Sequence, residues 1–205
     1  MSKIAVVFPG VGYNKDRPLL YYAGKAASAC GFELKHIDFS GIEWSKEKLK
    51  DRDFLLKTLD VCIKKAEDAL TGQGDMSGDE LVFISKSIGT VVATAYSFRK
   101  SLNVRHICFS PLDFINEYVS EKSAILFYGD NDPYADHKSI EKIARDKRLE
   151  MYKISGGNHS LETGDVSTDI DNLKGMIRRV TDVINDGTLF HTVNSFKEPK
   201  WKKTK

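Results

Sequence analysis

The chain has 205 residues, of which 41% are hydrophobic and 29% are charged, and its net charge is +2 at pH 7. This length suits one domain with a sizeable core, and the composition is ordinary for a globular protein. The near-neutral charge gives no reason to expect nucleic acid as a partner. No apolar run is long enough to span a bilayer. The apolar run near the N-terminus is broken at Pro9 and is too short for a signal peptide. We therefore expect a cytoplasmic protein without a membrane partner.

Short apolar runs alternate along the chain with segments of helical spacing. We expect strands, in chain order, at residues 4–8, 32–39, 81–84, 104–109, 124–128 and 149–154. Apolar residues repeat at intervals of three and four in the segments between and after them, notably at 19–30, 55–70, 140–148 and 170–184. Thr168 with Asp171 is expected to cap the last helix.

This alternation is typical of the doubly wound α/β class, with a mainly parallel six-stranded sheet and helices on both faces. The pattern is lost near Gly187. We therefore expect one domain at residues 1–187, followed by a basic C-terminal tail at 188–205 that is solvated.

In such a sheet, ligands and reactive groups gather beyond the carboxyl ends of the strands. Ser87 lies at the turn between the third strand and the next helix, in the sequence LVFISKSIGT. A nucleophilic serine on this turn needs small residues two positions away on each side, and Ser85 and Gly89 meet that need. The turn also leaves the N–H of Ile88 unpaired, as an oxyanion donor. We predict that Ser87 is a nucleophile; the alternative is a serine that only caps the next helix.

A serine hydroxyl needs a base to become a good nucleophile. His159 lies in a glycine-containing loop directly after the last strand, from which it can reach Ser87. The other histidines lie in or beside strands, at the start of a helix or in the tail, and are His36, His106, His137 and His191. Asp130 and Asp132 follow the fifth strand, and one of them would orient the imidazole. The alternative is an ordinary turn in which both bond only to their own backbone.

The order Ser87, Asp132, His159 along the chain is the order expected of the α/β-hydrolase family, which the sequence resembles from residue 4 to about 184. The resemblance rests on three short motifs, which are Ser85-Lys-Ser-Ile-Gly89, Gly129-Asp-Asn-Asp-Pro133 and Gly157-Asn-His-Ser-Leu161. The sequence is most similar to small members without a cap, such as dienelactone-hydrolase-like esterases. The resemblance implies that Ser87 is the nucleophile, that Asp132 rather than Asp130 is the acid, and that His159 is the base.

The family places its second oxyanion donor in the loop after the first of these strands, here Phe8-Pro-Gly-Val-Gly-Tyr13. By the resemblance, Val11 is the best match for this donor and Gly12 the next. The sequence departs from the family in having Pro9-Gly10 where many members have His-Gly, and in lacking the family's first two antiparallel strands.

A nucleotide-dependent oxidoreductase is a rival interpretation of the same loop. It rests on the two glycines of Gly10-Val-Gly12 and on Asp38 as a ribose-binding acid. Lys15 stands where the third glycine of the dinucleotide fingerprint belongs, and this interpretation leaves Ser87 and His159 without a role.

Only residues 110–123 separate the fourth and fifth strands, which leaves no room for a cap domain and predicts an open site. Tyr13, Leu112 and Phe114 are candidates to line an acyl pocket, although their side chains would equally cover the end of the sheet. The sequence therefore predicts a serine hydrolase that cleaves a small carboxylic ester or thioester through an acyl-enzyme intermediate. Its partner would be a small-molecule acyl substrate, with no cofactor and no metal. The alternative is a catalytically inactive binding module with the same fold, and the oligomeric state stays open.

Overall fold

A computed structural model of the chain describes residues 1–42 and 51–186. The helices and strands are, in chain order, β1 (Lys3–Phe8), α1 (Pro18–Ala29), β2 (Glu33–His36), α2 (Arg52–Leu70), the 3-10 turn η2 (Thr71–Gln73), β3 (Glu80–Lys86), α3 (Ile88–Arg99), β4 (Val104–Phe109), the 3-10 turn η3 (Asp113–Glu117), β5 (Ala124–Gly129), α4 (His137–Asp146), β6 (Glu150–Ile154) and α5 (Val166–Asp186). The expected basic tail lies outside the described residues, so the domain boundary at 187 stays a prediction.

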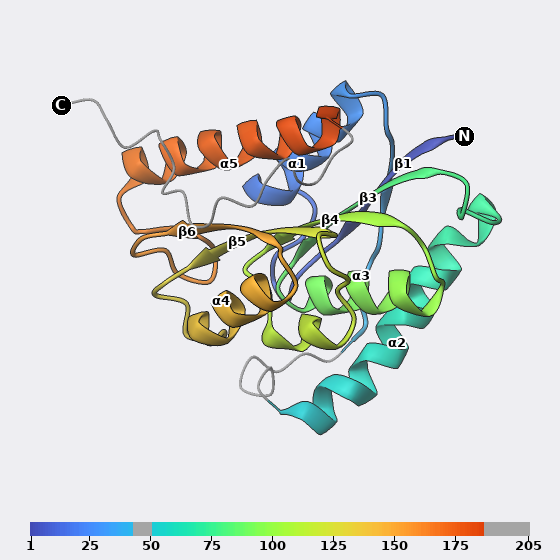
Figure 1. The fold of residues 1–205 in the computed structure, drawn as a ribbon, viewed down its shortest axis with the longest axis horizontal. Helices are drawn as coiled ribbons and strands as arrows, with labels where there is room; N and C mark the ends of the chain where they lie inside the picture. Colours follow the sequence, from blue (N-terminus) through green and yellow to red (C-terminus); the bar gives the residue numbers. More distant parts are fainter. Residues whose placement is uncertain (43–50, 187–205) are drawn as a thin grey trace.

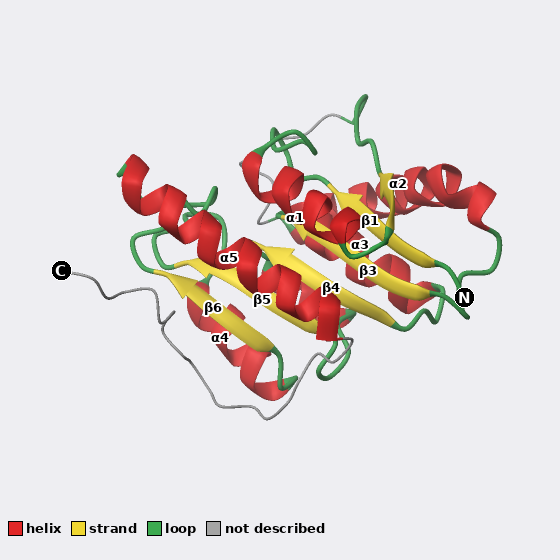
Figure 2. Ribbon diagram, turned by 90° about the horizontal axis from the view of Figure 1, so that it is seen from above, coloured by secondary structure: helices red, strands yellow, loops and turns green. Residues whose placement is uncertain are grey.

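The strands form one six-stranded sheet in the order β2-β1-β3-β4-β5-β6, and every neighbouring pair is parallel. Helices α1 and α5 cover one face of the sheet, whereas α2, α3 and α4 cover the other (Figure 1). The strand arrows all point the same way in the view from above, so their carboxyl ends meet at one edge (Figure 2). The predicted fold class, a doubly wound α/β domain with a parallel six-stranded sheet, is confirmed.

All six expected strands are present, and the second is shorter than predicted. It is an edge strand and pairs with its single neighbour, β1, only from Glu33 to His36. The flanking aromatic residues Phe32 and Phe39 are buried without belonging to the strand. Their apolar character made the strand look longer in the sequence.

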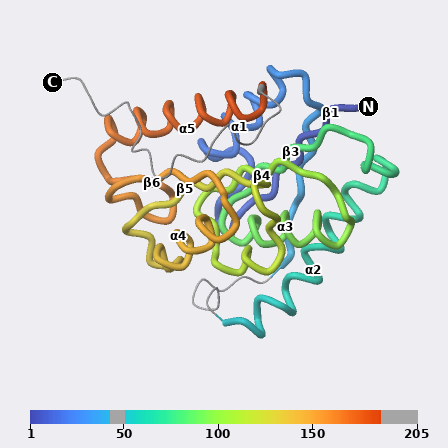
Figure 3. Tube along the Cα trace, in the orientation of Figure 1, coloured from blue at the N-terminus to red at the C-terminus, as the bar shows by residue number. Residues whose placement is uncertain are grey.

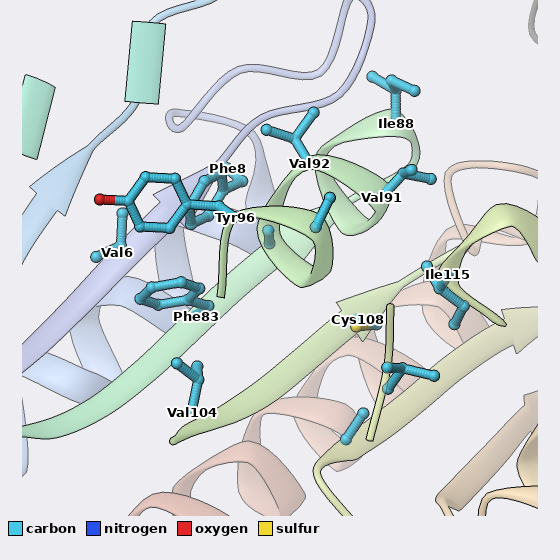
Figure 4. Close-up of a cluster of buried hydrophobic side chains, with 14 of the residues drawn as sticks. Val6, Phe8, Phe83, Ile88, Val91, Val92, Tyr96, Val104, Cys108 and Ile115 are labelled. Atoms are coloured by element: carbon cyan, nitrogen blue, oxygen red, sulfur yellow. The ribbon is translucent and has the colours of Figure 1, made fainter. Parts of the chain in front are cut away.

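The core has two layers because successive residues of each central strand point to opposite faces of the sheet. In β1, Val6 and Phe8 pack on the α2 and α3 side, whereas Ala5 and Val7 pack on the α1 and α5 side. Figure 4 shows the first layer, in which the ring centroids of Phe8 and Phe83 lie 5.1 Å apart. The two faces explain why the strands read as continuous apolar runs.

Helices α1 and α5 stand at opposite ends of the chain and lie side by side on one face of the sheet (Figure 3).

Helix α5 begins at Val166, four residues earlier than the apolar repeat suggested. The predicted cap of Thr168 with Asp171 is wrong, because Asp165 accepts a hydrogen bond from the Thr168 N–H at 2.8 Å. Ile170, which the apolar repeat placed on the buried face, is the fifth residue of α5 and is 59% exposed. None of the helices in the described residues combines the length and apolar character needed to cross a bilayer.

Candidate active site

Ser87 is the single residue between β3 and α3, and its backbone has φ 55° and ψ −125°. A non-glycine residue with such a positive φ costs on the order of 1–3 kcal/mol and persists only where its surroundings hold it. The Ser87 N–H donates to the Phe109 carbonyl at 3.0 Å, and the Thr90 N–H and hydroxyl donate to the Ser87 carbonyl at 2.9 and 2.7 Å. These bonds hold the corner that turns the serine side chain away from the sheet.

The residues two positions from Ser87 are small for different reasons. A Cβ atom on Gly89 would lie 2.4 Å from the Pro9 carbonyl oxygen, so no side chain fits where α3 crosses the end of β1. Ser85 is fully buried, and its hydroxyl donates to the Ile107 carbonyl at 3.2 Å. A serine is therefore accommodated at the position where the common motif has glycine.

Ser87, His159 and Asp132 lie in one hydrogen-bonded row at the carboxyl edge of the sheet. The Nε2 atom of His159 lies 2.8 Å from the Ser87 Oγ, and its Nδ1 atom lies 2.7 Å from the Asp132 Oδ2. Burial alone would raise the pKa of Asp132, but the hydrogen bond and charge of His159, the Tyr134 N–H and the Lys86 charge outweigh it. The pKa of Asp132 is therefore below its usual value, and the carboxylate is ionised at neutral pH.

The two aspartates after β5 have separate hydrogen-bond partners, and only Asp132 meets the imidazole. Asp130 accepts the Gly156 N–H at 2.6 Å and lies 3.5 Å from the Lys153 ammonium. It fastens the loop between β6 and α5 rather than meeting the imidazole. Asp132 accepts the Tyr134 N–H at 2.8 Å with its other oxygen, so this one carboxylate both closes a turn and faces His159.

The loop that carries His159 lies directly against the end of β5. A Cβ atom on Gly129 would lie 2.0 Å from the Gly157 carbonyl oxygen. The same carbonyl accepts the Asn131 N–H at 3.0 Å, so the loops after β5 and β6 are joined beside the aspartate and the histidine. The Asn158 side chain accepts the Ser160 N–H at 2.7 Å and shapes the turn around His159.

The loop after β1 forms a tight turn from Gly10 to Tyr13, closed by hydrogen bonds of 3.0 and 3.2 Å between these two residues. Within the described part of the chain, the N–H groups of Val11, Gly12 and Ile88 have no hydrogen-bond partner. Ile88 is the first residue of α3, where a helix leaves its N–H groups unpaired. The structure thus brings the predicted oxyanion donors to the edge of the sheet where Ser87 lies.

A cavity of about 300 Å³ opens beside the serine. Its lining residues are Val11, Gly12, Tyr13, Lys86, Ser87, Pro133, Tyr134, Asn158, His159 and Ser160. Of the three candidate substrate contacts, Tyr13 belongs to this lining, whereas Leu112 and Phe114 do not. Leu112 is 1% exposed in the core on the α2 and α3 side, and Phe114 lies beneath the Arg52 guanidinium. The expectation fails for these two because the chain after β4 turns into η3 and packs on α3.

The remaining candidates of the sequence lie elsewhere. His106 is buried in β4, with its Nε2 atom 3.0 Å from the Ser97 Oγ, and His137 begins α4. His191 lies outside the described residues. Among residues 1–42 and 51–186, no cluster of histidine, cysteine or acidic side chains is arranged to hold a metal ion. Sequence reasoning missed Lys86, Ser110 and Tyr134, which all contact His159.

Known proteins are similar to this chain in structure, at low sequence identity. No family model and no curated protein matches the chain. XCC1541 from Xanthomonas campestris pv. campestris, a proposed hydrolase of the alpha/beta superfamily, is similar with a TM-score of 0.66 at 13% identity, over 90% of this chain and 99% of that one. Two further solved structures are similar at low identity.

XC6422 from Xanthomonas campestris, an α/β serine hydrolase without a lid, gives a TM-score of 0.58 at 11% identity over 91% of this chain and 82% of its own. Est1E from Butyrivibrio proteoclasticus gives 0.64 at 10% identity over 91% of this chain and 88% of its own. Sequence identities this low establish similarity of fold only. The narrower resemblance to dienelactone-hydrolase-like esterases stays a prediction. The chain has the α/β-hydrolase fold.

Proposed function

We propose that the protein is a serine hydrolase that cleaves a small carboxylic ester or thioester through an acyl-enzyme intermediate. The observation that carries the proposal is the continuous row of hydrogen bonds from the Ser87 hydroxyl through the His159 imidazole to the Asp132 carboxylate. A buried, ionised aspartate at the Nδ1 atom favours the tautomer whose Nε2 accepts a proton from serine.

In the first step, His159 takes the Ser87 proton while the serine oxygen attacks the carbonyl carbon of the substrate. The tetrahedral intermediate collapses when the imidazolium returns this proton to the leaving alcohol or thiol, which leaves the acyl group on Ser87. A water molecule, deprotonated by His159, then attacks the acyl group, and the serine leaves with the proton. Asp132 stabilises the imidazolium in both halves of the reaction.

The negative charge of the tetrahedral intermediate needs donors that are already in place. The unpaired N–H groups of Ile88 and of Val11, with Gly12 as the alternative to Val11, are the proposed oxyanion hole. Loss of one such donor typically costs roughly 2.7–4 kcal/mol of transition-state stabilisation. The Gly10–Tyr13 turn holds the second donor without help from a side chain.

The size of the cavity favours a small substrate, because about 300 Å³ is near the lower end of ordinary ligand sites. Tyr13 and Tyr134 line the same cavity as Ser87 and offer aromatic surface for an acyl or leaving group. Ester and thioester carbonyls are attacked through the same steps, so the triad fits both.

The test is hydrolysis of a panel of p-nitrophenyl esters and acyl thioesters of increasing chain length. We expect turnover that Ser87→Ala abolishes and that Asp132→Asn lowers by about 10⁴-fold, because the amide favours the wrong imidazole tautomer. Ser77→Ala, in the exposed loop before β3, is the matched control and should keep full activity. Turnover that survives Ser87→Ala would refute the proposal. A folded wild type that hydrolyses nothing in the panel would favour the inactive binding module.

A further inference from the structure

Lys86 is 1% exposed. It is the only Lys, Arg, Asp or Glu residue in the described part of the chain that is buried as a whole. It occupies the last position of β3, directly before Ser87. Taking an ammonium group out of water is costly unless a carboxylate neutralises it. No carboxylate in the described residues lies within ion-pair distance of the Lys86 Nζ. A methionine of similar length would fill this space without that cost.

The Lys86 side chain reaches from the end of β3 to the loop that carries His159. Its Nζ donates to the main-chain carbonyl of His159 at 2.6 Å and lies 5.3 Å from the centroid of the Tyr13 ring. The Ser110 hydroxyl, which follows β4, donates to the same carbonyl at 2.8 Å. His159 is therefore held at two ends, by Asp132 at its ring and by Lys86 and Ser110 at its backbone.

From this arrangement we propose that Lys86 is a positioning residue, whose ammonium fixes the backbone of His159 at hydrogen-bonding distance from Ser87. The proposal rests on the proposed function for its effect on catalysis, because it acts through His159 and not on the substrate. It also accounts for a charged residue in a place where burial disfavours charge.

The charge on Lys86 makes this contact dependent on pH. Burial lowers the pKa of Lys86 to about 7, which Asp132 and Glu162 only partly oppose. The groups that face it are Asp132 after β5, His159 and Glu162 after β6, and Tyr13 after β1. Above this pKa the contact changes from a charge-assisted hydrogen bond to that of a neutral amine, which is about half as strong. The rate of acylation of Ser87 should therefore fall on the alkaline side of neutrality.

The experiment measures the rate of Ser87 labelling by a fluorophosphonate from pH 5.5 to pH 9.5 in three proteins. For the wild type we expect an alkaline limb between pH 7 and pH 9. Lys86→Met should label roughly 10- to 100-fold more slowly at pH 6.5, since a small displacement of a catalytic group has effects of this size, and should have no alkaline limb. Ser110→Ala, the matched variant that removes the other bond to the same carbonyl, should label more slowly but keep the limb.

Hydrogen–deuterium exchange of residues 155–161 separates this proposal from the proposed function. Faster exchange in Lys86→Met than in the wild type supports the tether even if the wild-type serine proves unreactive. Wild-type labelling without an alkaline limb overturns the proposal, and that result needs no variant to fold. A Lys86→Met protein that labels at the wild-type rate, keeps the limb or exchanges no faster in this loop also overturns it.

Discussion

Replacement of Lys86 by methionine should make the protein more stable, by an amount that depends on pH. Burial depresses the pKa of Lys86 from 10.5 to about 7, and a difference of one in pKa corresponds to about 1.4 kcal/mol. The cost of this lysine to the folded state is therefore on the order of 5 kcal/mol at low pH. Loss of its hydrogen bond to the His159 carbonyl offsets about 1 kcal/mol of the gain.

The sign of the pH dependence follows from proton binding. Between pH 7 and pH 10.5 the unfolded chain holds the Lys86 proton and the folded chain does not, so raising the pH stabilises the wild type relative to its unfolded state. Below pH 7 both states are protonated and the full cost is present. The advantage of Lys86→Met should thus be about 3–4 kcal/mol at pH 6 and should shrink by about 2.5 kcal/mol at pH 9.

Urea unfolding of both proteins at pH 6 and pH 9 measures this difference directly. Lys57→Met, which replaces an exposed lysine of α2, is the control and should change the free energy of unfolding by no more than about 0.5 kcal/mol at either pH. A Lys86→Met protein that is less stable than the wild type at pH 6 would show that burial of this lysine does not destabilise the fold. An advantage of equal size at both pH values would show that the lysine is not desolvated as described.

Three further substitutions test other parts of the structure. Gly129→Ala places a Cβ 2.0 Å from the Gly157 carbonyl oxygen, so it should lower the melting temperature and slow the labelling of Ser87. Gly78→Ala, with open space around it, is the control and should do neither. A stable Gly129→Ala protein that is labelled at the wild-type rate would contradict the loop contact. Ser87→Gly relieves the strain of the positive φ, so its free energy of unfolding in urea should be about 1–3 kcal/mol higher than that of Ser87→Ala. Equal stability of the two would mean that the corner is unstrained. Asp165→Ala removes the cap of α5 and should cost about 1 kcal/mol, whereas Asp171→Ala should be near neutral, and the reverse result in thermal melts would restore the cap expected from the sequence.

The sheet was predictable because parallel strands buried on both faces leave continuous apolar runs in the sequence. The grouping of Ser87, Asp132 and His159 was predictable for a related reason: each follows a strand, and the carboxyl ends of parallel strands meet at one edge. The choice between Asp130 and Asp132 depended on the resemblance, because both follow the same strand. Only the three-dimensional course of the β6–α5 loop gives Asp130 a different partner.

Contacts between loops could not be predicted from residue patterns. Gly129 and Gly157 each look like an ordinary turn residue, and their shared need for space exists only where two loops touch. Leu112 and Phe114 follow a strand, as the three residues of the candidate site do, but the chain after β4 folds back into the core. Lys86 sits in a motif that drew attention to its neighbours, and its own burial depends on a carbonyl 73 residues away in the chain.

Mass spectrometry of the purified protein after treatment with a fluorophosphonate shows whether Ser87 is an activated nucleophile. We expect one adduct per chain, located on Ser87, and its loss in His159→Ala, because the imidazole 2.8 Å from the hydroxyl would no longer activate the serine. A well-folded wild type that takes up no label, or one labelled equally well without His159, would contradict it.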